Sequence, residues 1–154
     1  MLVLVADDDP VYRDLMNTLL GQWGFEVTLA ADGNQAWEIL QRPNAPNLVI
    51  LDWMMPGMDG FEVCRRIREA KGADSTYVLI MTGGCNREEL IKVVVVGADD
   101  YMIKPFEPLD MKVRLRTATR ILNMQEELRR LRDQAVRKSS PDSAEFDLAA
   151  TRSN

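Results

Sequence analysis

Residues 47–60 read NLVILDWMMPGMDG. Leu48–Leu51 is an uninterrupted apolar run of strand length, and it ends at Asp52, ahead of a segment rich in Pro and Gly. A carboxylate in this place lies at the carboxyl end of a buried strand, which is the edge of an open α/β sheet where ligands bind. Asp52 could instead cap the next helix, but Asp59 stands closer to the start of that helix, near Phe61. The stretch therefore predicts a buried parallel strand that ends in a functional carboxylate.

The composition is that of a globular domain with residues to spare. The chain has 154 residues, 46% hydrophobic and 28% charged, and an ordinary domain takes roughly 100–150. No run approaches the roughly twenty apolar residues of a membrane span, and Leu2–Ala6 is too short for a secretory signal. Cys64 and Cys85 lack a metal-binding spacing, which favours a reducing cytoplasm. Because the chain has no histidine, Ser-His and Cys-His nucleophile pairs and the usual transition-metal sites are excluded.

Charge is unevenly distributed along the chain. Residues 112–138 hold nine Lys and Arg against three acidic residues, a balance of +6. Since the whole chain carries −5, the remainder carries −11. The sequence therefore predicts an acidic body followed by a basic helix.

Apolar runs of strand length alternate with amphipathic segments over the first 120 residues. In the first helical segment, which begins at Pro10, Gly21 and Gly24 are expected to end the helix. Five strands that alternate with five helices predict a doubly wound α/β fold, in which one parallel sheet is covered on both faces. The predicted strands are Leu2–Val5, Phe25–Ala30, Leu48–Leu51, Tyr77–Met81 and Asp100–Ile103.

Polar residues stand at the ends of four of these strands. Asp7 and Asp8 follow the first strand, Asp52 follows the third, Thr82 the fourth and Lys104 the fifth. Taken singly, each has an ordinary explanation as a helix-start, turn or solvated residue. Because the carboxyl ends of parallel strands share one edge of the sheet, we expect the five side chains to meet there.

Three neighbouring carboxylates repel one another unless a cation lies among them. Mg²⁺ suits such a site because it keeps waters and takes one or two carboxylates, whereas Ca²⁺ takes roughly six to eight oxygens. A metal beside a lysine and a hydroxyl is suited to phosphoryl transfer, which depends on positioning and charge neutralisation. Asp52 is then the expected nucleophile, forming an acyl phosphate.

In this order the motifs resemble those of the receiver domains of two-component response regulators. The resemblance covers residues 1–122 and is specific in its spacing, with 30 residues from Asp52 to Thr82 and 22 from Thr82 to Lys104. It implies a flavodoxin-like five-stranded parallel sheet in the order 2-1-3-4-5. The motifs are VADDD (5–9), LDWMMPGMDG (51–60), MTGG (81–84) and GADDYMIKPF (97–106).

The resemblance implies a role for each residue at the predicted edge. Asp52 resembles the phospho-acceptor, Asp8 the acid that binds Mg²⁺ directly, and Asp7 its neighbour that acts through water. With Asp52, the backbone carbonyl of Met54 would complete the protein's metal ligands. Thr82 would donate a hydrogen bond to a phosphoryl oxygen.

The resemblance also implies which residue pairs with the phospho-acceptor and which residues move when the domain is phosphorylated. Lys104 would pair with Asp52 and then with the phosphoryl group, through a Lys104–Pro105 peptide bond that is typically cis in this family. On phosphorylation the Thr82 hydroxyl would move and the Tyr101 ring would turn inward; Tyr101 is equally explained as an ordinary half-buried strand residue. A sensor histidine kinase or phosphotransfer protein would supply the phosphoryl group. The domain would catalyse only its own phosphorylation and dephosphorylation, so it is not expected to be an enzyme in the ordinary sense.

Helix-forming sequence continues beyond the point where a receiver normally ends. Nothing interrupts it from Arg120 to Lys138, and its apolar residues recur at 3-4-3-4 spacing. Residues 123–138 therefore predict a helical extension that forms a coiled coil and a homodimer, although the stripe could fold back on its own chain or fray. Residues 139–154 are polar and predict a disordered tail. The stripe consists of Ile121, Met124, Leu128, Leu131 and Ala135.

Three other interpretations concern the output. Extended helices of this kind resemble connectors to output domains such as diguanylate cyclases, so the chain is either a single-domain regulator of a downstream protein or part of a longer regulator. Nucleic-acid binding is disfavoured because the basic helix lacks a reading motif, and no membrane partner is expected. A phosphohydrolase with an aspartyl nucleophile needs a second acid two residues later, where Met54 stands.

Overall fold

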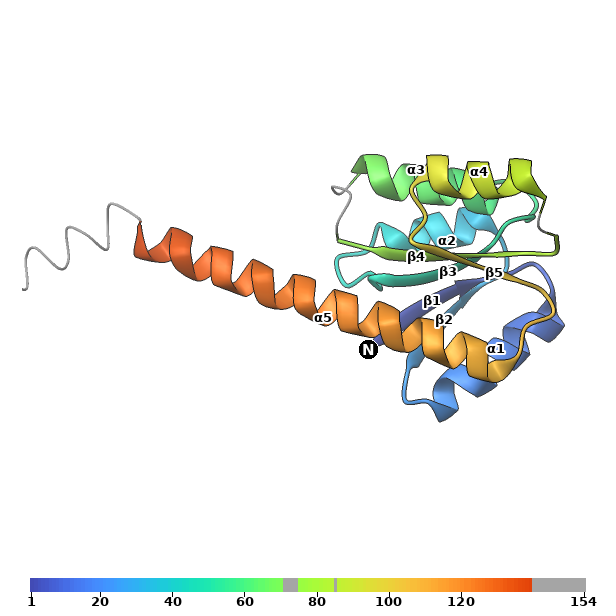
Figure 1. The fold of residues 1–154 in the computed structure, drawn as a ribbon, viewed down its shortest axis with the longest axis horizontal. Helices are drawn as coiled ribbons and strands as arrows, with labels where there is room; N and C mark the ends of the chain where they lie inside the picture. Colours follow the sequence, from blue (N-terminus) through green and yellow to red (C-terminus); the bar gives the residue numbers. More distant parts are fainter. Residues whose placement is uncertain (71–74, 85, 140–154) are drawn as a thin grey trace, which may run out of the picture. The chain divides into compact units, whose positions relative to one another are not determined.

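The computed structural model describes residues 1–70, 75–84 and 86–139. A parallel five-stranded sheet runs in the order β2-β1-β3-β4-β5 (Figure 1), which confirms the predicted doubly wound fold and its strand order. The strands are β1 (Leu2–Ala6), β2 (Glu26–Ala30), β3 (Leu48–Asp52), β4 (Tyr77–Thr82) and β5 (Asp100–Ile103). The helices are α1 (Pro10–Gln22), α2 (Gly33–Leu40), α3 (Gly60–Ala70), α4 (Arg87–Val96) and α5 (Pro108–Lys138).

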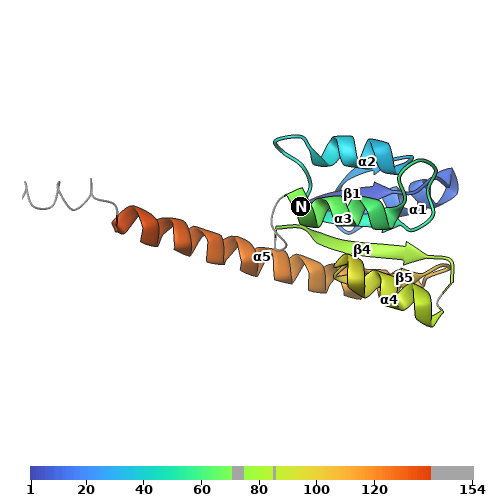
Figure 2. The same ribbon diagram turned by 90° about the horizontal axis from the view of Figure 1, so that it is seen from above.

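Two apolar cores lie on opposite faces of the sheet. Because strand side chains alternate, Val3 and Val5 enter the core beneath α1 and the first part of α5, while Leu4 and Ala6 enter the core beneath α2 and α3. In the view from above, α2, α3 and α4 lie side by side across that second face (Figure 2). Burial on both faces explains why β3 and β4 are continuous apolar runs.

Side-chain caps and one glycine set the ends of several helices. The Asp9 carboxylate accepts the Val11 N–H at the start of α1, and the Asp59 carboxylate accepts the Glu62 N–H at the start of α3, at 2.9 and 2.8 Å. Asp59 is thus the cap, which leaves Asp52 free for another role. The prediction for Gly21 is wrong, because α1 continues through it to Gln22 and the positive φ of 88° falls at Gly24.

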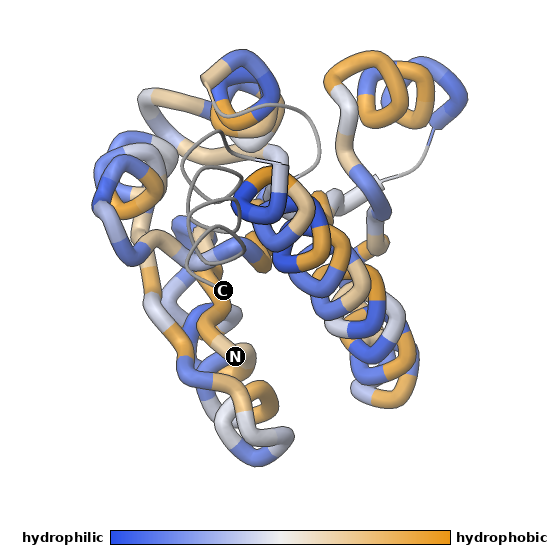
Figure 3. The backbone as a smooth tube through the Cα atoms, turned by 90° about the vertical axis from the view of Figure 1, so that its left-hand side faces the viewer, coloured by the Kyte–Doolittle hydropathy of each residue, from blue (hydrophilic) through white to orange (hydrophobic). Residues whose placement is uncertain are grey.

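The contacts divide the chain into Met1–Leu122 and Asn123–Asn154. Within the first unit, α5 contributes a buried apolar stripe of Met111, Leu115, Ala118 and Leu122. Along α5, hydrophobic and hydrophilic positions alternate (Figure 3). The predicted disordered tail, apart from Ser139, lies outside the described residues. In the part of the chain that the structure describes, no helix is both long and apolar enough to cross a membrane.

Candidate functional site

The sheet register brings the predicted polar residues to one edge. Ala6 is level with Leu51, so Asp7 and Asp52 extend from neighbouring strands at the same height. Asp52 is level with Met81, and Thr82 lies one residue beyond it. Since Thr82 is in turn level with Ile103, the next residue, Lys104, reaches the same edge.

Lys104 joins the carboxylates of two strands. Its Nζ lies 2.6 Å from Oδ2 of Asp7 and 3.3 Å from Oδ1 of Asp52. Asp7 also accepts the Asp9 N–H at 2.9 Å. We expected Lys104 to pair with Asp52, and the structure places it within ion-pair distance of Asp52 but nearer to Asp7.

Strand alternation explains why these three side chains share a side of the sheet. Asp7, Asp52 and Lys104 each follow by two residues a strand residue of the core beneath α1 and α5. A period of two therefore sends all three in the same direction. The strand residues that precede them are Val5, Ile50 and Met102.

Asp8 completes a group of three acids. One carboxylate oxygen from each of Asp7, Asp8 and Asp52 lies within 4.8 Å of the other two, a set that we call the carboxylate cluster. Asp7 and Asp52 are buried and Asp8 is exposed. With Lys104 the four side chains carry a formal charge of −2, so hard oxygen ligands and an uncompensated negative charge together fit a divalent cation such as Mg²⁺.

Thr82 is buried at the same edge, but its hydroxyl bonds elsewhere. It donates to the carbonyl oxygen of Gly84 and accepts the Gly84 N–H at 3.1 Å. Thr82 comes two residues after Ile80, which lies in the core beneath α2 and α3. Its position in the strand alternation therefore directs its side chain to the opposite face of the sheet from that of Asp52. A hydrogen bond from Thr82 to a phosphoryl group would require its hydroxyl to leave Gly84.

The other predicted residues have these positions. Tyr101 is half-buried in β5, and its N–H donates to Asp100 at 2.8 Å. Met54 lies two residues beyond Asp52 with a side chain 72% exposed. The Lys104–Pro105 peptide bond is cis.

The profile of the response regulator receiver domain matches residues 3–116. This chain belongs to the response regulator receiver family. The match confirms the resemblance that the motifs indicated, and it covers the five strands and the first turns of α5.

Similarity to individual proteins and solved structures supports the same family. The DNA-binding response regulator MtrA of Mycolicibacterium smegmatis is 33% identical over 148 residues, which cover 96% of this chain and 59% of that protein. The chemotaxis protein CheY4 of Vibrio cholerae is 32% identical, with a TM-score of 0.68 over 79% of this chain and 98% of that one. The receiver domain of sensor histidine kinase PA1611 from Pseudomonas aeruginosa PAO1, solved with a magnesium ion in its active-site cleft, is 26% identical, with a TM-score of 0.68 over 75% and 94%. The receiver spans about half the length of the curated relatives it matches.

Burial and charge shift two pKa values in the receiver site. Burial raises the pKa of Asp52 to about 6, the negative charge of Asp7 adds to the effect, and Lys104 opposes it. Burial alone would lower the pKa of Lys104, but its hydrogen bond to Asp7 and the charges of Asp7 and Asp52 outweigh burial and raise that pKa. The site therefore holds a carboxylate whose ionisation costs free energy and a lysine that stays protonated.

Two residues of α1 that the sequence reasoning missed also contact the site. The Lys104 ammonium lies 4.0 Å from the centre of the Tyr12 ring, a cation–π contact. Arg13 donates to the backbone carbonyl of Asp7 at 2.7 Å. The available signal was Pro10, because a helix that begins there places its first turn beside the carboxyl end of β1.

The raised pKa of Asp52 predicts a pH-dependent stability. An acid whose pKa is higher in the folded state loses folding free energy as it ionises, so the cost is absent below about pH 4, grows up to about pH 6 and is complete above it. Asp52→Asn removes this cost. In chelator, we expect the variant to be more stable than the parent chain by about 2 kcal/mol at pH 7.5, and the gain to disappear at pH 4 in thermal unfolding.

Asp14→Asn, which changes an exposed aspartate of α1, serves as the control and should give a small difference of constant size. A gain for Asp52→Asn that does not depend on pH would contradict the electrostatic explanation. So would a loss of stability at pH 7.5.

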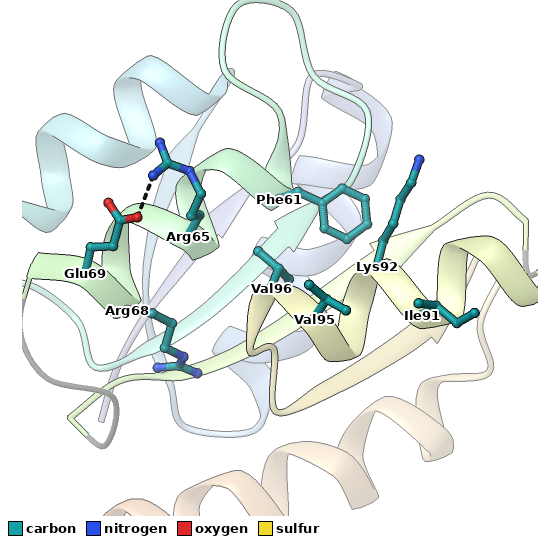
Figure 4. A pocket seen from close by; sticks show the side chains of 8 residues that line it. All are labelled: Phe61, Arg65, Arg68, Glu69, Ile91, Lys92, Val95 and Val96. Atoms are coloured by element: carbon teal, nitrogen blue, oxygen red, sulfur yellow. Dashed lines mark hydrogen bonds and ion pairs between the residues drawn. The ribbon is translucent and has the colours of Figure 1, made fainter.

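A hollow of about 510 Å³ lies between α3 and α4 of the receiver and contains no residue of the carboxylate cluster. Figure 4 shows Phe61 and Val96 at this hollow, with Arg65 ion-paired to Glu69 on its α3 side. Arg68 also lines the hollow, and its guanidinium group forms hydrogen bonds that connect separate segments of the chain. It donates to the carbonyl oxygens of Gly97 and Thr76 and to the carboxylate of Asp99, at 2.7 to 2.8 Å.

These bonds predict that Arg68 is worth far more to stability than its neighbour Arg65. Arg68 is 14% exposed and joins α3 to the start of β4 and to the segment after α4. Arg65 is 50% exposed and, among the residues that the structure describes, pairs only within α3. We expect Arg68→Met to lower the free energy of unfolding by about 2 kcal/mol and Arg65→Met by less than about 1 kcal/mol, measured by urea denaturation. Equal losses would show that Arg68 does not hold these segments together.

Proposed function

We propose that this receiver accepts a phosphoryl group on Asp52 and passes the signal on by a change of conformation. The observation that carries the proposal is the carboxylate of Asp52 at the end of a buried strand, within 4.8 Å of oxygens of Asp7 and Asp8 and 3.3 Å from the ammonium of Lys104. An aspartate placed among hard ligands and beside a fixed cation is suited to phosphoryl transfer, which depends on positioning and charge neutralisation.

Each residue has a separate part in the proposed reaction. An Asp52 carboxylate oxygen bonds to phosphorus while the bond from phosphorus to the donor's leaving atom breaks. Lys104, held between Asp7 and Asp52, offsets the charge of the phosphoryl oxygens. Thr82 donates its hydroxyl to one of these oxygens after it leaves Gly84.

The metal is proposed from the chemistry of the ligands. Asp7, Asp8, Asp52 and the carbonyl of Met54 would hold Mg²⁺, which would neutralise the crowded negative charge when bound. The similar PA1611 receiver was solved with magnesium in its active-site cleft. Without metal, burial and the charge of Asp7 raise the pKa of Asp52 to about 6. Bound Mg²⁺ favours the ionised carboxylate and lowers this pKa, so we expect phosphorylation to weaken only at pH values below about 6.

The partners follow from this chemistry. A sensor histidine kinase or phosphotransfer protein in the cytoplasm supplies the phosphoryl group, and the receiver acts only on itself. Movement of Thr82 and Tyr101 passes the signal to a downstream protein or to an output domain on the same polypeptide, and α5 mediates a homodimer. The relatives are longer than this chain and include a protein named as a DNA-binding response regulator, which supports the alternative in which the receiver is joined to an output domain.

Labelling with a small phosphodonor such as acetyl phosphate tests the proposal. We expect intact-mass spectrometry to show one added phosphoryl group in the presence of Mg²⁺ and none in chelator. Reduction of the acyl phosphate with borohydride, followed by peptide mapping, should locate it at Asp52. Labelling at another residue, or equal labelling in chelator, would overturn the assignment.

A further inference from the structure

The second half of α5 carries an apolar stripe that the receiver core does not use. Its four large side chains are 37% to 60% exposed, although they recur at heptad spacing. By contrast, the α5 residues that face the sheet are at most 3% exposed. We call the exposed stripe the seam; it consists of Ile121, Met124, Leu128, Leu131 and Ala135.

The seam is not a continuation of the stripe that packs on the sheet. The buried stripe ends at Leu122, and its next positions at the same spacing are the polar residues Gln125, Arg129 and Arg132. At 100° per residue, the two stripes are about 120° apart around the helix. The face that packs on the sheet therefore cannot also bury the seam, which argues against folding back.

A second copy of this chain suits the seam in charge as well as in periodicity. With Ile121 and Leu128 at position a, and Met124 and Leu131 at position d, Glu127 takes position g and Arg132 takes position e. In a parallel, in-register pair, position g faces position e five residues later on the other helix. Glu127 then meets Arg132 of the partner subunit, once on each side of the seam.

These two charges are available for such pairs. Glu126, at the outward position f, pairs with Arg129 and Arg130 on its own helix, at 3.4 and 3.7 Å. Among the residues that the structure describes, Glu127 and Arg132 take part in no such pair. An antiparallel arrangement with Leu128 opposite Leu131 would bring g to g and e to e, and it would offer neither charge an opposite partner.

The geometry points to a parallel, in-register two-stranded coiled coil over residues 121–138, formed with a second copy of this chain and oriented by Glu127–Arg132 pairs. This inference deepens the homodimer of the proposed function. It fixes the direction and register of the two helices.

Charge reversal tests the pairing. By sedimentation equilibrium, we expect Glu127→Arg and Arg132→Glu each to raise the dissociation constant of the dimer about tenfold, and the double variant to restore it. Glu126→Arg makes the same change of charge at the outward position and should leave the dimer intact. A monomeric parent chain, or a dimer that neither reversal weakens, would overturn the inference.

Disulfide trapping tests the direction. In a Cys85→Ser background, in which the remaining Cys64 is buried, we expect Leu128→Cys to cross-link with its own copy under mild oxidation and the outward Arg130→Cys not to do so. Cross-linking only between a mixture of Leu128→Cys and Leu131→Cys chains would show an antiparallel pair and contradict the inference. Labelling of Asp52 in the same samples reports separately on the phospho-acceptor, so failure of one proposal does not imply failure of the other.

Discussion

Replacing Asp52 with Asn is expected to abolish phosphoryl labelling by a small donor, down to the background of the assay. The amide lacks the anionic oxygen that would bond to phosphorus. Within the described part of the chain, no other carboxylate lies at the same point between Asp7, Asp8 and Lys104. Intact-mass spectrometry of the variant beside the parent chain, with the donor and Mg²⁺, measures the effect.

The matched control is Asp9→Asn. Asp9 caps α1, and asparagine serves equally well at that position. The variant therefore changes the same chemical group, next to the cluster residue Asp8 in the chain, while the helix start is kept. It should be labelled like the parent chain. Labelling of Asp52→Asn at the parent level would mean that a different residue accepts phosphorus.

Gly33→Ala is expected to lower the free energy of unfolding by about 3 kcal/mol or more. A Cβ atom at Gly33, the first residue of α2, would lie 1.8 Å from the carbonyl oxygen of Met58 and 2.6 Å from its carbonyl carbon. Because the obstacle is backbone, α2 or the loop between β3 and α3 has to move. Urea denaturation gives the magnitude.

Gly21→Ala makes the same substitution where nothing lies within 4 Å of the added atom. Gly21 lies within α1, so the methyl group should stabilise the helix, by up to about 1 kcal/mol. Opposite signs for the two variants would support the close contact at Met58. A similar loss of unfolding free energy in both variants would show that the close approach to Met58 is not the cause of the loss at Gly33.

The fold and the convergence of the site residues could both be predicted from the sequence. The continuous apolar runs of β3 and β4 indicated strands covered on both faces, and parallel strands carry their following residues to a common edge. Asp7, Asp52 and Lys104 meet for that reason, as their ion-pair distances show. Alternation and chain order were enough to predict a common edge, whereas the strand order 2-1-3-4-5 came from the resemblance to receiver domains.

Details that depend on a few tenths of an ångström, or on contacts between distant residues, were not predictable. Whether Lys104 lies closer to Asp7 or to Asp52 depends on side-chain placement, and the bonds of Thr82 to Gly84 depend on the shape of one turn. The approach of Gly33 to Met58 joins segments that no local pattern relates. Gly21 was misread because a glycine within a helix and one that ends it look alike until the φ angle of Gly24 is known.

The change of apolar face near Leu122 has a consequence for chain length. The buried stripe fixes the rotation of α5 about its axis up to Leu122, and an insertion after that residue would turn every later side chain by ~100° for each residue added. Adding seven residues would return the seam to nearly its original direction around the helix axis, whereas adding two would turn it to almost the opposite side of the helix. Natural variants with indels at this point should therefore differ in length by whole heptads.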